Sequence, residues 1–107
     1  MNFKLLIDPL AKQDLIDIFN FVAANDSEEN ANKLLENLEN TCLDLEKLPT
    51  RGHIPEELRN TGMKRFLEIH YKPYRIIYEI IDRVVYVHLV ADGRRNTHDL
   101  LSERLLR

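Results

Sequence analysis

The residues that could do chemistry in this chain are cations and histidines, and most of them lie in its second half. Arginine and lysine side chains bind anions such as phosphate, and a histidine imidazole can transfer a proton near neutral pH. The candidates for binding an anionic target are Lys64, Arg65, Arg75, His88, Arg94 and Arg95, with His98 and His70 as further imidazoles. The alternative for each is a structural or merely solvated side chain, which is the commoner role of a lone histidine or an exposed lysine.

Charge is divided unevenly along the chain. Residues 1–48 hold 4 Lys/Arg against 10 Asp/Glu, whereas residues 49–107 hold 11 against 8, so the net charge of −3 combines an acidic half with a basic one. Two such halves can contact different partners, although solvated helices also carry acidic faces. The basic half is the part suited to an anionic target.

Length and composition predict one globular domain that covers residues 1–107. A chain of 107 residues buries a single modest core, and 44% apolar with 31% charged residues is typical of a folded protein. Cys42 has no partner for a disulfide and no metal-type Cys/His spacing around it, so we expect a buried thiol, no metal site and no cofactor. The apolar run at the N-terminus is too short to span a membrane, which predicts a cytoplasmic protein without membrane contact.

The first half predicts a strand followed by two helices. Phe3 to Ile7 is a short apolar run, and Asp8-Pro9 supplies an N-cap followed by proline at the first helical position. Apolar residues then recur every three or four positions up to Asn25, and again from Ala31 to Leu48 after a capping box at residues 26–29. The two helices, joined by a short turn, should lie antiparallel.

The second half predicts a loop, three strands and a terminal helix. Residues 49–62 contain glycine and proline amid polar residues, which is typical of a loop. Strands are expected at residues 64–71, 74–81 and 84–91, with Asp82-Arg83 as a tight hairpin turn. Thr97 can cap a short helix whose apolar face is Leu100, Leu101, Leu105 and Leu106. The fold class is therefore α+β, with the order β-α-α-β-β-β-α and an antiparallel sheet that carries the helix hairpin on one face.

A two-residue turn at 82–83 assigns the hairpin's side chains to faces. Opposite residues then have numbers that sum to 165, which places one apolar group toward the helices: Ile76, Tyr78, Ile80, Val85, Val87 and Leu89. The other face carries Arg75, Ile77, Glu79, Tyr86, His88 and Val90, joined by Glu68 and His70 of the preceding strand. We expect Arg75 to point away from the helix pair, either into an open groove or onto a solvated face screened by Glu68 and Glu79.

Several segments of the sequence resemble the RelE/ParE toxin superfamily. The matching residues are Leu48-Pro49, Gly52, Pro55-Glu56, Gly62, Tyr74 to Glu79 and His88 to Arg95. The resemblance covers nearly the whole chain, because a two-helix hairpin followed by a three-stranded meander is also that family's layout. It implies the toxin of a type II toxin–antitoxin system, related to the ParE-like plasmid stabilisation toxins, which an antitoxin segment wraps and whose release stops growth.

The resemblance also carries individual residues. Arg75 and Arg95 stand where RelE-type enzymes keep phosphate-binding arginines. The ribosome-dependent nuclease has two strand lysines and a C-terminal tyrosine at positions that fall near Phe66, Glu68 and Leu101. These three groups are absent here, and the Glu68 carboxylate would repel the anion that a lysine would stabilise. These departures favour the ParE-like activity.

The resemblance therefore favours a ParE-like inhibitor of DNA gyrase that acts by binding and is neutralised by a cognate antitoxin. The alternative is a RelE-like, metal-independent endoribonuclease that cuts mRNA on the ribosome with Arg75, Arg95 and His98. A third interpretation is a regulatory member that binds its antitoxin and harms nothing. A half-polar sheet face with a basic rim suits an acidic antitoxin segment that folds as it binds, in a toxin–antitoxin hetero-oligomer.

Overall fold

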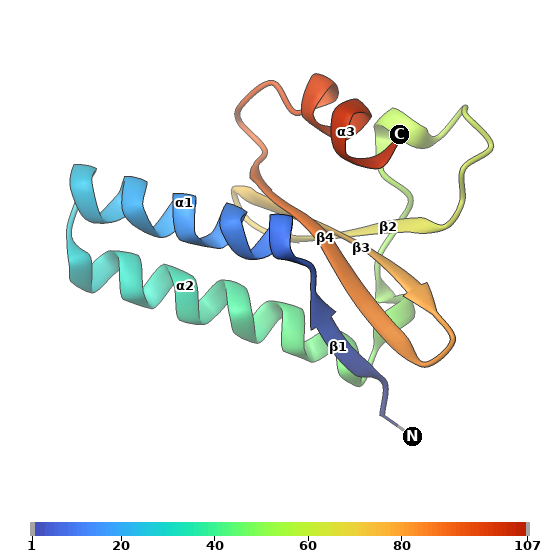
Figure 1. Cartoon of the computed structure of the whole chain (residues 1–107), viewed down its shortest axis with the longest axis horizontal. Helices are drawn as coiled ribbons and strands as arrows, with labels where there is room; N and C mark the ends of the chain where they lie inside the picture. Colours follow the sequence, from blue (N-terminus) through green and yellow to red (C-terminus); the bar gives the residue numbers. More distant parts are fainter. Residues whose placement is uncertain (1, 107) are drawn as a thin grey trace.

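The computed structural model describes residues 2–106, which form helices on both faces of a sheet (Figure 1). The elements are β1 (Lys4–Ile7), α1 (Pro9–Asn25), α2 (Glu28–Leu43), β2 (Phe66–Tyr71), β3 (Tyr74–Ile81), β4 (Val84–Asp92) and α3 (His98–Leu105), with short 3₁₀ turns at Asp44–Glu46, Pro49–Arg51 and Glu56–Leu58. The predicted α+β class and order of elements are confirmed.

The helix hairpin begins as the sequence predicts, with the predicted N-cap on α1 and a different one on α2. An Asp8 carboxylate oxygen accepts a hydrogen bond from the Ala11 amide at 2.9 Å, with Pro9 in the first turn. Ser27 caps α2 by accepting from the Asn30 amide at 3.0 Å. The predicted capping box is wrong, because the third helical position is Asn30 rather than a glutamate, and its side-chain amide bonds the Asp26 carboxylate instead.

The sheet has the strand order β1-β4-β3-β2, so the hairpin of β3 and β4 lies at its centre. The turn is the predicted one, with Ile81 opposite Val84 and Asp82 at a φ of 55°. The sheet is not wholly antiparallel, because β1 runs parallel to β4, with Lys4 opposite Val84. The first strand thus becomes an edge strand beside the last one.

Each face of the sheet has its own apolar core. The helices α1 and α2 cover one face, where the buried residues include Leu15, Leu38, Cys42, Ile76, Tyr78, Val85 and Val87. Helix α3 and residues of the loop before β2 cover the other face (Figure 1), where they bury Leu58, Phe66, Ile77, Leu89, Leu101 and Leu105. Cys42 is fully buried, as predicted, and burial raises the pKa of its thiol to about 12, with a smaller contribution from Glu39.

A β-bulge changes the predicted faces in the second half of the hairpin. The pairing that sums to 165 holds from Ile81 to Tyr78, and beyond it Ile77 lies opposite Leu89, with His88 as the extra residue. Because side chains alternate along a strand, the shift moves Leu89 to the α3 side and Val90 to the helix-pair side. The predicted positions of these two residues are therefore wrong.

The terminal helix closes the face that the sequence analysis left open. Leu101 and Leu105 are buried against the sheet, as predicted. The prediction for Leu106 is wrong, because it is 43% exposed and follows the end of α3. Thr97 stands at the N-cap but its side chain makes no capping bond. The apolar part of the second face is therefore a second core, because α3 supplies the side chains that cover it.

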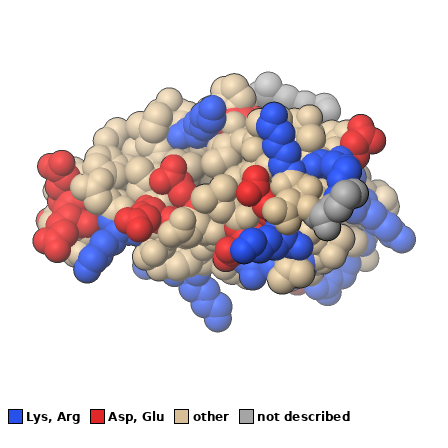
Figure 2. Space-filling model, turned by 90° about the horizontal axis from the view of Figure 1, so that it is seen from below, with Lys and Arg blue, Asp and Glu red and all other residues tan. Residues whose placement is uncertain are grey.

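Acidic and basic side chains are also unevenly distributed over the surface. Figure 2 shows acidic side chains at the end where Figure 1 places the turn between α1 and α2, and mainly basic ones toward the opposite end. No helix in the described part of the chain is long and apolar enough to cross a membrane.

Candidate functional site

Arg75 lies on β3 and points away from the helix pair, as predicted, but its guanidinium is not open. Its side chain is 13% exposed. Glu57 holds it from the loop by two bonds, from Nη1 at 2.7 Å and from Nη2 at 2.8 Å. Glu68 on β2 accepts from Nε and, at 2.9 Å, from Nη2, and the Thr97 hydroxyl accepts from Nη1 at 2.6 Å. Arg75 does line a cavity of about 260 Å³. The expectation of a free guanidinium there is wrong, because two carboxylates bind it.

These contacts fix the charge state of the pair. The hydrogen bonds from Arg75 lower the pKa of the Glu57 carboxyl from 4.5 to about 2, against the opposing effect of burial. Bonds to Glu57 and then to Glu68 raise the pKa of Arg75. The arginine stays charged, and the carboxylates of Glu57 and Glu68 already neutralise its charge. A phosphate could bind the guanidinium only by displacing one of these carboxylates.

The lowered pKa of Glu57 predicts a pH-dependent part of the stability. A carboxyl with a depressed folded-state pKa stabilises the fold fully above its ordinary value of 4.5, and this stabilisation is lost as the pH falls toward about 2. We expect urea denaturation to show a free energy of unfolding that declines through this window, and Glu57→Gln to remove that part of the decline. Glu56→Gln, on the neighbouring exposed carboxylate, is the control. Equal pH slopes for wild type and Glu57→Gln would contradict this role.

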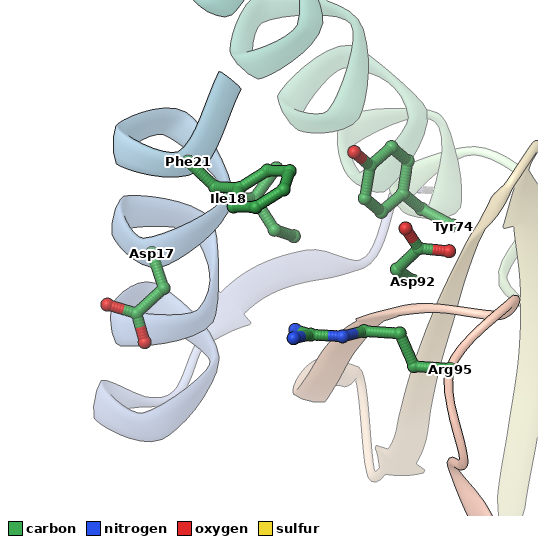
Figure 3. A pocket seen from close by; sticks show the side chains of 6 residues that line it. All are labelled: Asp17, Ile18, Phe21, Tyr74, Asp92 and Arg95. Carbon is green, nitrogen blue, oxygen red and sulfur yellow. The ribbon is translucent and has the colours of Figure 1, made fainter. Parts of the chain in front are cut away.

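The two arginines after β4 differ in their surroundings. Arg94 is 72% exposed and holds the Asp92 carboxylate by two side-chain bonds of 3.0 and 2.8 Å, which lowers the pKa of Asp92. Arg95 is exposed and reaches toward α1 at the edge of a cavity of about 250 Å³ (Figure 3). The cavity is lined by Asp17, Ile18, Phe21, Tyr74, Asp92 and Arg95. In the described residues no side-chain hydrogen bond holds the Arg95 guanidinium, so its donors are available to a ligand.

His88, the extra residue of the bulge, is engaged on both sides of its ring. Nδ1 lies 2.9 Å from Oδ2 of Asp8, and Nε2 lies 2.9 Å from Oε1 of Glu79. Asp8 is also the N-cap of α1, so His88 links that helix end to β3 and β4. Its contacts are those of a structural bridge between two carboxylates.

The remaining predicted cations do not join Arg75 in one site. Lys64 and Arg65 are exposed just before β2, near the hairpin end of the sheet, where Arg65 lies 4.8 Å from the Phe66 ring centre and 3.9 Å from Glu79. Arg94 and Arg95 follow the other end of β4, about 20 Å away along the strand. His98 is exposed at the start of α3. The fold therefore divides the basic residues between two ends of the sheet.

Comparison with known proteins then decides the family. Residues 5–97 match the model of the ParE toxin of type II toxin–antitoxin systems, parDE. The chain belongs to the ParE toxin family. The toxin's predicted likeness to the RelE/ParE superfamily is thereby confirmed. A search of curated proteins gave no match.

Solved structures from both branches of the superfamily share the toxin's fold. A chain of the chromosomal ParDE system from P. aeruginosa has a TM-score of 0.70 at 13% identity, covering 84% of this toxin and 95% of that chain. The RelBE2 toxin–antitoxin complex from Mycobacterium tuberculosis gives 0.64 at 19% identity, with coverages of 86% and 99%. The E. coli toxin RelE, as a double arginine-to-alanine mutant in the free state, gives 0.64 at 22% identity, with coverages of 100% and 98%.

The three positions where the toxin departs from the nuclease pattern are closed by the fold. Phe66 is 3% exposed and Leu101 is 1% exposed, and both belong to the core beneath α3. Glu68 is 2% exposed and pairs with Arg75. None of these three side chains is presented to solvent as a free donor or acid.

Several residues that support the candidate site carry no signal in the sequence. Glu57 and Thr97, which complete the shell of Arg75, lie in irregular segments where no periodicity assigns a direction. Asp14 of α1 binds the Arg104 guanidinium at 3.1 and 2.8 Å and accepts from the Val90 amide at 3.0 Å. Arg104 also donates to the His88 carbonyl at 2.9 Å. These bonds satisfy backbone groups of β4 beyond Val87, where its pairing with β1 ends.

Proposed function

We propose that this type II toxin inhibits DNA gyrase by binding and does not cleave RNA. The observation that carries the proposal is the enclosure of Arg75 by Glu57 and Glu68, with its side chain only 13% exposed. A ribonuclease of the RelE kind needs cations that are free to stabilise the charge of the phosphorane. The compensated Arg75 and the buried Phe66 and Leu101 do not offer that chemistry.

We propose Arg95 as the main target-binding cation, with the neighbouring Arg94 in support. Arg95 is exposed beside a cavity, and in the described part of the chain its guanidinium makes no side-chain hydrogen bond. Charge-assisted bonds from such a donor are roughly twice as strong as neutral ones. Lys64 and Arg65 lie before β2, at the other end of the sheet, and His88 is occupied by Asp8 and Glu79.

A cognate antitoxin is the expected partner in the cytoplasm, as in the toxin–antitoxin systems that share this fold. The sheet face first expected to receive it is covered by α3. The helix hairpin offers an alternative surface, a cavity of about 470 Å³ whose lining includes Leu15, Ile16, Phe19 and Leu35. We propose that an amphipathic antitoxin segment covers this apolar surface.

The gyrase proposal is tested by comparing two activities of the free toxin. We expect the purified toxin to inhibit gyrase supercoiling of plasmid DNA, and primer extension after induction to show intact messages. Arg95→Ala should weaken the inhibition by about tenfold, the loss expected for one charge-assisted contact, with an unchanged melting temperature. Lys33→Ala, an exposed charge on α2, is the matched control.

Cut messages with normal gyrase activity would instead support the alternative, an endoribonuclease. Codon-linked cuts in messages together with unimpaired supercoiling would overturn the proposal in favour of a ribosome-dependent endoribonuclease that uses Arg95 and His98. Full inhibition by Arg95→Ala would instead remove Arg95 from the binding site.

A further inference from the structure

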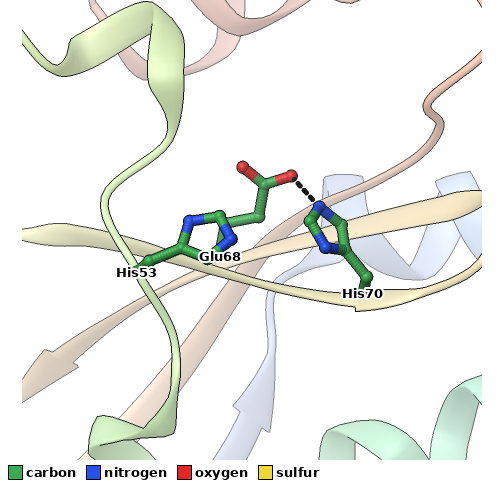
Figure 4. Close-up of side chains that lie close together, drawn as sticks. All are labelled: His53, Glu68 and His70. Atoms are coloured by element: carbon green, nitrogen blue, oxygen red, sulfur yellow. Dashed lines mark hydrogen bonds and ion pairs between the residues drawn. The ribbon is translucent and has the colours of Figure 1, made fainter.

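Two imidazoles and one carboxylate meet at the outer edge of β2 (Figure 4). His53, Glu68 and His70 each offer one ligand atom within 4.8 Å of the others. Nε2 of His70 lies 2.8 Å from Oε2 of Glu68, and the centres of the two imidazole rings are 5.4 Å apart. We infer that this His–Glu–His cluster binds a divalent transition-metal ion, with Zn²⁺ as the representative case.

The backbone places the three side chains together. His53 pairs with Glu68 as an isolated antiparallel bridge, in which each amide donates to the other residue's carbonyl, at 3.0 and 2.7 Å. Residues directly opposite in such a pair project to the same side, and His70 follows two positions along the same strand. The ligand set is therefore held by β2 and its bridge rather than by a mobile loop alone.

The carboxylate has the support that metal ligands usually have. Glu68 is 2% exposed, and Arg75 donates to both of its oxygens. Hydrogen bonds of this kind orient ligating carboxylates, and a carboxylate oxygen with two lone-pair sites can accept such a bond and still coordinate a cation. Arg75 and Glu57 would act as the outer shell of the site.

The space and charge around the cluster suit a small cation. Two cavities of about 260 and 230 Å³ are lined by all three residues, which leaves room for water or another ligand on the ion. Tetrahedral Zn²⁺ at about 2.1 Å from each ligand needs ligand atoms about 3.4 Å apart, so the rings must move by about 1 Å. Both histidines are exposed and can make this adjustment. Two nitrogen ligands and one oxygen are a set that Zn²⁺ accepts with its fourth position open.

Metal binding would tie the loop before β2 to the sheet. His53 belongs to that loop, which also carries Glu57, whereas the other two ligands belong to β2. An ion bound only by the folded state raises its stability. The inference goes beyond the proposed gyrase activity and does not depend on it.

The test is a Zn²⁺ titration of the full chain after removal of adventitious metal with a chelator. Isothermal calorimetry should give one equivalent of Zn²⁺ bound, and the melting temperature should rise with Zn²⁺ and not with Mg²⁺. His53→Ala and His70→Ala should each weaken binding by at least about tenfold. His98→Ala, which removes an exposed histidine outside the cluster, should bind like the wild type.

A Co²⁺ titration gives a second readout that does not depend on stability. Its visible d–d absorption should appear with the wild type and His98→Ala and be lost with His53→Ala and His70→Ala. Circular dichroism of the metal-free variants establishes that they are folded. Absence of saturable Zn²⁺ binding, or binding that neither cluster variant weakens, would overturn the inference. The gyrase proposal would still stand or fall on the separate supercoiling assay.

Discussion

Replacing Arg75 with alanine is expected to lower the free energy of unfolding by about 3–5 kcal/mol, the cost of breaking a buried ion pair from one side. Glu68 is 2% exposed and would lose the guanidinium, which leaves only the exposed His70 imidazole beside its carboxylate. Glu57 would lose both of its bonds to the guanidinium at the same time. Urea denaturation followed by far-UV circular dichroism measures the change.

Two further variants separate the lost ion pair from a general effect of removing an arginine. Arg94→Ala removes an arginine that is 72% exposed, and its unfolding transition should overlay on that of the wild type. The double variant Arg75→Met/Glu68→Leu removes both charges, and it should regain part of the stability that Arg75→Ala loses. A transition of Arg75→Ala that coincides with the wild type would show that the ion pair contributes nothing.

This result also decides how loss of toxicity is interpreted. If Arg75→Ala is destabilised, its inactivity reports unfolding and says nothing about anion binding. The double variant then tests the binding role directly, because it lacks the guanidinium and keeps an apolar side chain of similar length. Retained inhibition of gyrase by this variant would exclude Arg75 as a target-binding residue.

Gly52→Ala is expected to destabilise the toxin by about 3 kcal/mol, through overpacking and the loss of buried hydrogen bonds. A Cβ at this position would lie 2.5 Å from the Tyr78 hydroxyl and 2.8 Å from the Glu68 carbonyl oxygen. Tyr78 is fully buried, and its hydroxyl donates to the Pro49 carbonyl at 2.6 Å and accepts from the Gly52 amide at 3.1 Å. The added methyl group must therefore displace either a buried ring or the bridge at β2.

The steric origin of this effect is testable because the backbone of Gly52 is ordinary. Its φ of −77° suits any residue, so alanine adds contact rather than conformational strain. Gly62 has strain without contact, since its φ is 80° and nothing lies within 4 Å of an added Cβ. We expect Gly62→Ala to cost about 1 kcal/mol in thermal or urea unfolding. A larger loss at Gly62 than at Gly52 would contradict the packing argument.

The sequence alone determined the local features of this protein. Asp8 and Pro9 determine the start of α1. The two-residue turn at 82–83 determines the register of the β3–β4 hairpin next to the turn. It also determined that Arg75 points away from the helix pair, because the alternation along β3 is unbroken. The family followed from motifs in the expected order, and the family comparison agrees.

Only the tertiary structure decided what surrounds Arg75 and which face of the sheet is covered. The bulge at His88 reverses the alternation of β4, and it is stabilised by Asp8, Asp14 and Arg104, which are distant in sequence. Glu57 reaches Arg75 from an irregular segment whose direction no periodicity specifies. Hydrophobic periodicity reports which side of a helix or strand is buried. It carries no information on which distant residue pairs with a charged side chain or which element covers a face of the sheet.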